Sequence, residues 1–470
     1  MTCDGSPEFT LTTSEKNDRG TEIILHIADD SKEFLEDFKI SELLTKYNKF
    51  MPVPIKFGTK TEKEGETEVV VDNIINNPNP AWTKQPNELT EEDYKSFYKE
   101  LYPMQFDEPL FHIHLNVDYP FNLTGILYFP KLTGDLQIQK DKIQLYQNQV
   151  FVTDNVEGIV PEFLTMLKGV IDSPDIPLNV SRSYLQADGN VKKISNYITR
   201  KVADKLKSLF NENRADFEQK WNDIKIVIEY GMLTDEKFYE KAGSFTLYPT
   251  VDDSYLTLDE IKEQFKANQT DKDGKLVVLY ASNKEAQHSY ISAAKEKGYT
   301  VLLLDSPIVP HLIQKLEMSN ENVTFIRVDS DHVDNLIKKD DAVVSKLTED
   351  ESKSLKEVVE KVVEGSSYTV QTEAMDSNAA PFMITQPEFM RRMKEMQATG
   401  GGGMFGNFPD MYNLVVNTNS ELASKILSTE DTESKNFLIK QAIDLAKLSQ
   451  GLLKGEELTA FVKRNFESIK

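Results

Sequence analysis

One arginine stands out in this sequence for the chemistry that its position permits. Arg182 follows a stretch that Pro174 and Pro177 hold extended, and Asn179 or Ser181 can cap the next helix. The sequence therefore predicts Arg182 in a helix's first turn, where the helix dipole disfavours a cation. An anion that approaches this turn would offset that cost, because arginine holds oxygen anions strongly. The alternative is a surface arginine in a local ion pair.

The elements that position Arg182 are predicted from the apolar pattern. Residues 145–152 form an apolar run short enough for one strand. Residues 163–171 follow Pro161 with the apolar spacing of a helix. Residues 191–221 read as one or two helices. Strand, helix and proline-rich loop would together present the arginine.

Composition limits the class of protein. The chain has 470 residues, 39% of them hydrophobic, a formal net charge of -23 and a single cysteine, Cys3. It is long enough for about three domains with cores of their own. The acidity argues against a nucleic-acid partner, because phosphate contacts need clustered Lys and Arg. One cysteine excludes an internal disulfide and suits a reducing cytoplasm, and no apolar run is long enough to span a membrane. We expect a cytoplasmic protein.

The first 57 residues hold too few elements for a core. A strand is predicted over Thr21–Ile27, a helix over Phe34–Phe50 and a second strand over Val53–Phe57. This segment looks like the end of a domain. Residues 58–77 follow, and their charged, apolar-poor composition predicts a linker.

A mixed domain is predicted over residues 78–342, with a large part to about residue 255 and a smaller α/β part after it. Its clearest strand is Phe111–Val117, in which His112 and His114 share one face. They could share a metal, but no third ligand recurs at metal spacing, so we expect a polar sheet face and no metal site.

The smaller part is a βαβ unit. Strands over Lys275–Tyr280 and Thr300–Leu304 flank a helix over Lys284–Lys297, a length that implies parallel strands. The first loop lacks the glycines of a dinucleotide fingerprint. Asp271–Gly274 resembles the start of a calcium loop but lacks its later glutamate, so we expect a turn.

Residues 343–470 form the last predicted domain, and they hold a helical run over Ser354–Glu364. One helix face with flexible apolar side chains is predicted from Met390, Met393 and Met396, and it lies next to the glycines 400–403 in the sequence. That face is either ordinary core or an adaptable binding surface for apolar segments. Two amphipathic helices, at residues 437–448 and 458–469, favour a four-helix bundle with a second copy. We expect the contacts of this homodimer to be made by Phe437, Ile443, Leu458 and Phe461.

Several long motifs resemble a known family. They are Arg19-Gly20-Thr21, NPAWT at 79–83, DEPLFHIHLNVDYPFNLTGILYFP at 107–130 and IDSPDIPLNVSRSYLQ at 171–186. The whole chain is similar to the later two-thirds of heat shock protein 90 chaperones of the bacterial HtpG type. The resemblance implies a mixed α/β, α+β multidomain fold. Its middle domain would have α/β sandwich subdomains like domain 2 of ribosomal protein S5, and its C-terminal domain would be helix-rich and dimeric.

The resemblance also implies roles for single residues. Arg182 would reach the γ-phosphate of ATP bound with magnesium, with Gln186 beside it, and Gly20 and Thr21 would match the last nucleotide motif. Partly folded client proteins would contact Phe106, an aromatic residue of a loop, and His311, which occupies a middle-domain position where the family has tryptophan. They would also contact the methionine helix and the residues after it, at Met390, Met393, Met396, Met404 and Phe405.

Two functions follow as hypotheses. In the first, the chain is a homodimeric chaperone that couples to ATP hydrolysis only when a complete nucleotide-binding domain is present. Residues 1–57 would be a remnant of that domain, so the chain alone is expected to bind ATP poorly and to be inactive as an ATPase. In the second, it is a scaffold without ATPase activity that pairs with intact chaperone subunits.

Overall fold

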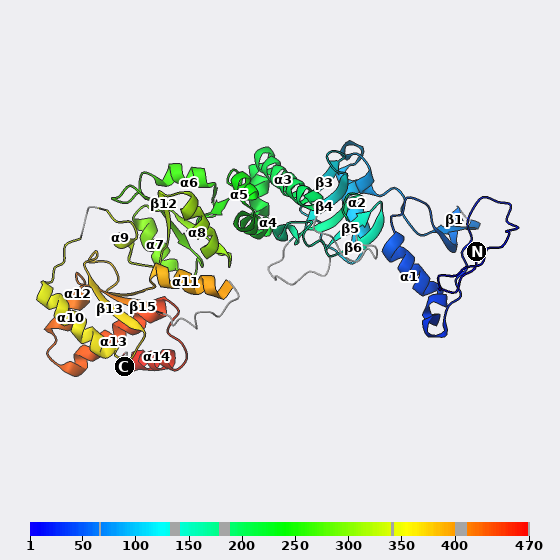
Figure 1. Ribbon diagram of the computed structural model, residues 1–470. Helices are drawn as coiled ribbons and strands as arrows, with labels where there is room; N and C mark the ends of the chain where they lie inside the picture. Colours follow the sequence, from blue (N-terminus) through cyan, green and yellow to red (C-terminus); the bar gives the residue numbers. More distant parts are fainter. Residues whose placement is uncertain (65–66, 132–141, 178–188, 340–342, 400–410, 469–470) are drawn as a thin grey trace.

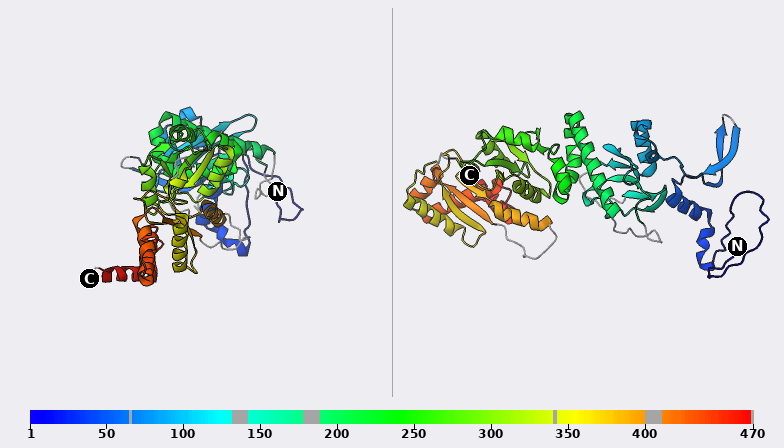
Figure 2. Two further views of the ribbon diagram at one scale, coloured as in Figure 1. Left: turned by 90° about the vertical axis from the view of Figure 1, so that its left-hand side faces the viewer. Right: turned by 45° about the horizontal axis from the view of Figure 1, so that its top comes forward.

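The computed structural model describes residues 1–64, 67–131, 142–177, 189–339, 343–399 and 411–468. They form an elongated row of units, with the N-terminal segment at one end and the C-terminal helices at the other (Figures 1 and 2). Helices and several separate sheets alternate along this row, which confirms the mixed α/β class and the multidomain architecture.

The N-terminal segment differs from the prediction. Its elements are the 3-10 helix η1 (Asp29–Leu35), α1 (Asp37–Asn48), β1 (Lys56–Glu64) and β2 (Thr67–Ile74). The helix is confirmed, but the strand predicted over Thr21–Ile27 is wrong. Ile23, Ile24 and Leu25 are exposed, and no described strand lies beside them. A strand needs a neighbour to satisfy its backbone groups, so the apolar run alone is not enough.

The charged segment after residue 57, which was predicted to be a linker, contains two paired strands. β1 and β2 pair antiparallel into an exposed hairpin, and the strand expected at Val53 begins only at Lys56. An ion pair of 2.6 Å between Lys56 and Asp72 joins the two strands. Cross-strand partners of this kind favour a hairpin in a sequence with few apolar residues.

Phe50 anchors the N-terminal segment to the next unit. Its side chain is fully buried, and its ring meets Trp82 edge-on at a centroid distance of 4.7 Å. Phe97 and Tyr146 surround the same ring. The Phe50 carbonyl also accepts a hydrogen bond of 2.8 Å from Gln149 Nε2. Together with the contact of Tyr47 of α1 on Phe151 of β6, the Phe50 ring packs the residues up to 57 against the following unit.

A five-stranded sheet of order β3-β4-β7-β5-β6 forms the large part of the middle region. Its elements are η2 (Ala81–Thr83), η3 (Pro86–Glu88), α2 (Glu91–Leu101), β3 (Phe111–Val117), β4 (Leu123–Phe129), β5 (Ile143–Gln147), β6 (Val150–Thr153), η4 (Glu162–Leu164), β7 (Lys168–Asp172), α3 (Gly189–Glu212), α4 (Arg214–Thr234) and α5 (Glu236–Ala242). The predicted strand Phe111–Val117 and the predicted pair of helices after residue 190 are confirmed.

Two predictions near Arg182 are wrong. The expected helix over residues 163–171 is a 3-10 turn followed by β7, in which every residue is buried. A short buried strand has no alternation, so its apolar run resembles a helix segment. The expected single strand over 145–152 is the hairpin β5–β6, because Asn148 and Gln149 turn the chain at φ 52 and 64°. Buried Asp172 accepts both of their backbone N–H groups.

The small part of the middle region is a parallel sheet of order β11-β10-β12. Its elements are β8 (Tyr248–Pro249), β9 (Tyr255–Leu256), α6 (Leu258–Phe265), β10 (Leu276–Ala281), α7 (His288–Glu296), β11 (Val301–Leu303), α8 (Val309–Ser319), β12 (Val323–Arg327) and α9 (Val333–Leu336). Val278 and Tyr280 pack with α8, and Val277 and Leu279 pack with α7, so helices cover both faces. The predicted parallel βαβ unit is confirmed, and Asp271 accepts the N–H groups of a turn.

The C-terminal unit is a three-stranded sheet of order β13-β15-β14 with helices around it. Its elements are α10 (Glu349–Val362), β13 (Tyr368–Glu373), β14 (Phe382–Thr385), α11 (Glu388–Thr399), β15 (Tyr412–Asn417), α12 (Glu421–Ser428), α13 (Thr432–Ser449) and α14 (Gly455–Ser468). The predicted helices at 354–364, 437–448 and 458–469 correspond to α10, α13 and α14, and the first ends two residues earlier than predicted. Thr348 caps α10 with a capping box.

Candidate functional site

The methionine helix α11 follows β14 and lies against the small part of the middle region (Figure 1). Glu388, Arg391, Arg392 and Glu395 recur at the spacing of one helix face. Met390, Met393 and Met396 project from the remaining circumference. The helix therefore has one charged face and one apolar face, and the two faces have different surroundings.

The charged face is buried against the middle region. Arg391 is only 3% exposed and donates to Glu395 at 2.6 Å and to the Tyr280 hydroxyl at 2.7 Å. Arg392 reaches α8, where it pairs with Glu317 at 2.8 Å and donates to the Phe325 carbonyl. These contacts hold α11 to strands β10 and β12 and to helix α8.

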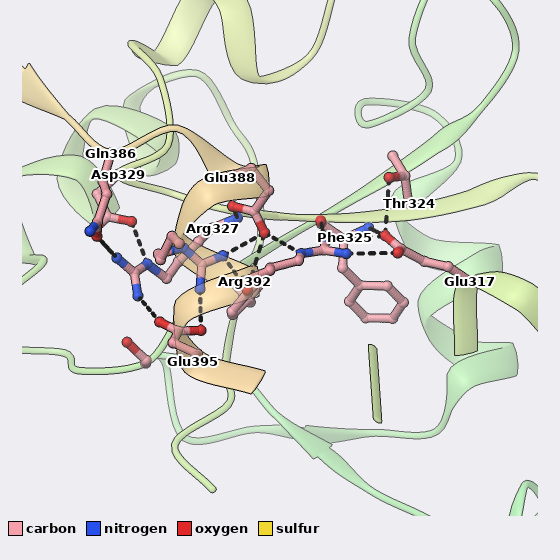
Figure 3. Close-up of polar contacts among 12 residues, drawn as sticks. Glu317, Thr324, Phe325, Arg327, Asp329, Gln386, Glu388, Arg392 and Glu395 are labelled. Atoms are coloured by element: carbon pink, nitrogen blue, oxygen red, sulfur yellow. Dashed lines mark hydrogen bonds and ion pairs between the residues drawn. The ribbon is translucent and has the colours of Figure 1, made fainter. Parts of the chain in front are cut away.

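A third arginine completes the network from the middle region (Figure 3). Arg327, at the end of β12, forms two hydrogen bonds to Asp329 and one of 2.9 Å to Glu395 of α11. Its remaining bond goes to Gln386, just before α11. Three arginines thus meet four carboxylates, and the fork of each guanidinium fixes the helix in rotation as well as position.

Glu388 lies at the centre of this network. Burial acts to raise the pKa of its carboxyl, but Arg391 and Arg392 hold that pKa below its usual range. The carboxylate is therefore charged at neutral pH. Burial also opposes the charge of Arg391, yet Glu388 and Glu395 raise its pKa. Each ion is stabilised only by the others, so removal of one would leave an uncompensated buried charge.

The apolar face of α11 is partly exposed among the described residues. Phe389 is 71% exposed and Met393 is 40% exposed, while Met390 and Met396 are half-buried beside them. This exposure favours a binding surface over ordinary core. Flexible thioether side chains next to an exposed phenylalanine form a surface that can adapt to different apolar segments.

The other residues expected to bind clients lie apart from each other. Phe106 is 93% exposed on the loop between α2 and β3, whereas α11 lies beyond α3 and α4 along the molecule (Figure 1). His311 is half-buried on α8, the helix whose Glu317 holds Arg392. His311 thus shares α8 with a residue that contacts the methionine helix, whereas Phe106 lies in a different part of the molecule.

Of the predicted nucleotide residues, the structure describes Gly20 and Thr21. The other predicted nucleotide residues, Arg182 and Gln186, lie outside the described residues, as do the predicted client residues Met404 and Phe405. Gly20 and Thr21 are exposed and belong to no helix or strand.

Of the four residues expected at a dimer interface, only Phe437 is exposed. Leu458 is half-buried, and Ile443 and Phe461 are buried by their own chain. Ile443 belongs to the C-terminal core, and α13 and α14 contact each other after the turn that joins them. The exposed apolar residues of this helix pair are Phe437, Leu445, Leu448, Val462 and Phe466.

His112 and His114 pack against one aromatic ring. His112 stacks on Tyr94 at 3.6 Å, and His114 Nδ1 lies 2.9 Å from the Tyr94 hydroxyl. Burial lowers the pKa of His114 to about 4, with His112 adding to the effect. This arrangement is the expected polar sheet face, packed under α2.

Sequence reasoning missed a second cluster between the middle and C-terminal units. Asp331, His332 and Glu373 lie close enough to hold a cation. His332 Nε2 lies 2.6 Å from Glu373, and Asn335 donates to the same oxygen. Burial opposes the charge of His332, but Glu373 raises its pKa. The cluster joins α9 to the end of β13. No local spacing in the sequence could have indicated this cluster, because Glu373 lies about forty residues after His332.

Comparisons with known proteins agree on one family. A profile described as Hsp90 protein matches residues 59–451. The chain is similar to a chaperone protein HtpG of Bacteroides fragilis strain YCH46, with 50% identity over all of this chain and 79% of that protein. It is 52% identical to HtpG of Porphyromonas gingivalis strain ATCC 33277, over 95% of this chain and 66% of that protein. HtpG of Alcanivorax borkumensis is 30% identical over 96% of this chain.

Among the described helices, none has both the length and the apolar composition needed to cross a bilayer.

Proposed function

This chain belongs to the Hsp90 family of chaperones, and from that premise we propose that the open face of α11 binds partly folded client proteins. The single observation that carries the proposal is the division of α11 between a buried charged face and an exposed face of Phe389 and Met393. Clients expose apolar segments of varied shape, and methionine side chains can repack around them. The charged face would keep the helix in place while the other face adapts.

Substitution of Met393 by aspartate tests this role. A charge on the open face should weaken the contact with apolar segments, so Met393→Asp should suppress client aggregation at least about threefold less well, by loss of roughly 1 kcal/mol of apolar contact. The measurement is light scattering of a heat-denatured test protein with increasing chaperone. Met318→Asp on α8 is the matched control, because Met318 is 77% exposed and is not among the residues proposed to bind clients. Equal suppression by both variants would remove the client role from α11.

We further propose that Phe106, His311, Met404 and Phe405 contribute secondary client contacts, and that the chain works as a homodimer in the cytoplasm. The high exposure of Phe106 supports its share of this role. The exposed residues of α13 and α14 support the dimer, since an unpartnered apolar helix pair favours burial against a second copy.

The Hsp90 family binds ATP, and we propose that Arg182, with Gln186 beside it, contacts the phosphates of ATP bound with magnesium. A guanidinium there would stabilise the charge that develops on the transferred phosphoryl group. Gly20 and Thr21 would contribute to the nucleotide site, which needs the family's complete nucleotide-binding domain.

Arg182→Ala, placed in a chain that carries this complete domain, should lower ATP turnover by about a hundredfold or more while nucleotide affinity stays nearly constant. Steady-state hydrolysis and equilibrium nucleotide binding give the two values. Arg200→Ala is the control, because Arg200 is an exposed arginine of α3. Unchanged turnover would defeat the assignment of Arg182.

A further inference from the structure

A cavity of about 190 Å³ lies between the middle and C-terminal units. One wall comes from the loop between β10 and α7 and from the end of β12. The other comes from β14, the start of β15 and the residues after α13. Ser282, Asn283 and Ala286 are exposed, so they form a mouth toward solvent.

The cavity occupies the place where α/β sheets bind ligands. The sheet has the order β11-β10-β12, so β10 is the central strand. After β10 the chain forms β11 on one side of it and later forms β12 on its other side. The crevice outside the carboxyl ends of β10 and β12 is thus a topological switch point, the usual ligand position in open parallel sheets. Ser282 and Asn283 directly follow β10, while Arg327 ends β12 and Asp329 follows it, and all four line the cavity.

Three residues that line the cavity each carry a buried polar atom with no hydrogen-bond partner in the described part of the chain. These atoms are Gln287 Nε2, Thr385 Oγ1 and Gln450 Nε2, and the residues Gln287 and Thr385 are 4% and 1% exposed. The orientation of the Gln287 amide is fixed, because its Oε1 accepts the N–H groups of Ser282 and Asn283. Its nitrogen must therefore point the other way. Buried polar atoms without partners are uncommon, and three around one cavity indicate a missing partner.

The charges at the wall are already balanced. Arg327 is paired with Asp329 and Glu395 and also donates to Gln386. No described arginine or lysine at the cavity is left to meet an anion, because Arg327 is the one cation that lines it. The unpartnered groups are two amide nitrogens and one hydroxyl, which are neutral. A neutral molecule rich in oxygen acceptors fits them, whereas a carboxylate or phosphate would lose its hydration without a countercharge.

Apolar side chains complete the lining. Ile384 and Leu452 face the cavity with the ring of Tyr412. Such a combination of amides, a hydroxyl and an aromatic ring suits a molecule with carbon-bound hydrogens on one side and hydroxyl groups on the other.

We propose that this cavity binds a small neutral polyol of about six to eight non-hydrogen atoms, since a cavity of roughly 150 Å³ holds six-carbon benzene. Gln287 and Gln450 donate to its oxygens, and Thr385 shares a further hydrogen bond. Because the two walls belong to different units, the bound polyol joins the middle unit to the C-terminal unit.

Erythritol and succinate test the proposal, since they have equal numbers of non-hydrogen atoms but differ in charge. Binding to the full chain is followed by saturation-transfer NMR and by competition between the two compounds. Erythritol should bind saturably with a Kd of about 1 mM, and succinate should not. Thr385→Val removes the hydroxyl at constant shape and should weaken erythritol binding about three- to tenfold. The variant should be at least as stable as the original, because an unpartnered buried hydroxyl is lost.

Gln450→Met is the second variant and should weaken erythritol binding by a similar factor. Thr369→Val on the exposed side of β13 is the control and should leave binding unchanged. The proposal is overturned by any of three results: no saturable erythritol binding at about ten times the expected Kd, tighter binding of succinate, or erythritol binding that neither cavity variant weakens. Aggregation suppression by Met393→Asp is independent of all three.

Discussion

At the scale of single residues, burial decides which groups can change charge near neutral pH. Glu229 of α4 is buried and one of its carboxylate oxygens has no partner. Burial raises the pKa of Glu229 to about 7, and Asp305 adds to this, while Ser306 and Lys225 act against it. The residue therefore titrates where α4 meets the small part of the middle region.

Glu229 should make stability depend on pH in a defined direction. Its pKa is higher in the folded chain than the ordinary value of 4.5. The protonated form thus stabilises the fold fully below about pH 4.5, and this contribution is lost as pH rises through about 7, by up to roughly 3 kcal/mol. Glu229→Gln removes the titrating carboxyl, so this loss of stability should disappear. Urea unfolding at about pH 5 and about pH 8 should therefore show that the free energy of unfolding of the variant rises relative to that of the original at the higher pH.

Glu240→Gln is the matched control, because Glu240 is exposed on α5. It should follow the pH dependence of the original chain. Parallel stability curves for the original and Glu229→Gln would show that Glu229 keeps an ordinary pKa.

At the scale of elements, α11 is held by charge rather than by apolar packing. Such an attachment is specific in geometry, and it fails when one partner is removed. This is the reverse of the usual amphipathic helix, which buries its apolar face. The inversion leaves methionines available to a partner.

Arg391→Met should detach α11. The substitution leaves Glu388 and Glu395 without their shared cation at a buried position, which costs about 3–5 kcal/mol. Amide hydrogen exchange should rise across residues 388–399 and in β12, with little change in the sheet of the large middle part. Lys353→Met, at an exposed position of α10, serves as the control. Unaltered protection of α11 would mean that other contacts hold it.

Much of the architecture could be predicted from the sequence, and the failures have physical causes. The alternating strand Phe111–Val117 and the βαβ unit were identifiable because local periodicity reports burial. β7 was missed because both of its faces are buried, which removes the alternation. The charges of α11 were visible at helical spacing, but their partners Arg327 and Glu317 lie about seventy residues away. No local pattern contains such a pairing.

At the scale of the whole molecule, the exposed apolar residues of α13 and α14 form a candidate contact surface near the described C-terminal end. Phe466 is 66% exposed and Leu445 is 52% exposed. Helices of this kind favour an isologous contact with a second copy.

Phe466→Asp should therefore shift the chain from dimer to monomer. A buried aromatic anchor of an interface contributes about 2 kcal/mol or more, so the dimer Kd should rise at least about thirtyfold. Light scattering coupled to size-exclusion chromatography measures the mass over a range of concentrations. Tyr119→Asp is the control, because Tyr119 is 85% exposed on the loop between β3 and β4. A monomeric original chain, or an unchanged mass for Phe466→Asp, would place the dimer contact elsewhere.

The fully buried ring of Phe50 has a mechanical consequence. The chain around it is tied by the bond from Gln149 to its carbonyl and by the bond from Asn77 N–H to the Lys49 carbonyl. Because the ring packs on Trp82, a force applied to the chain before Phe50 would load the aromatic cluster around Trp82 at this point. A force large enough to extract the ring would expose that cluster to water, so Phe50 should set the mechanical resistance of this junction.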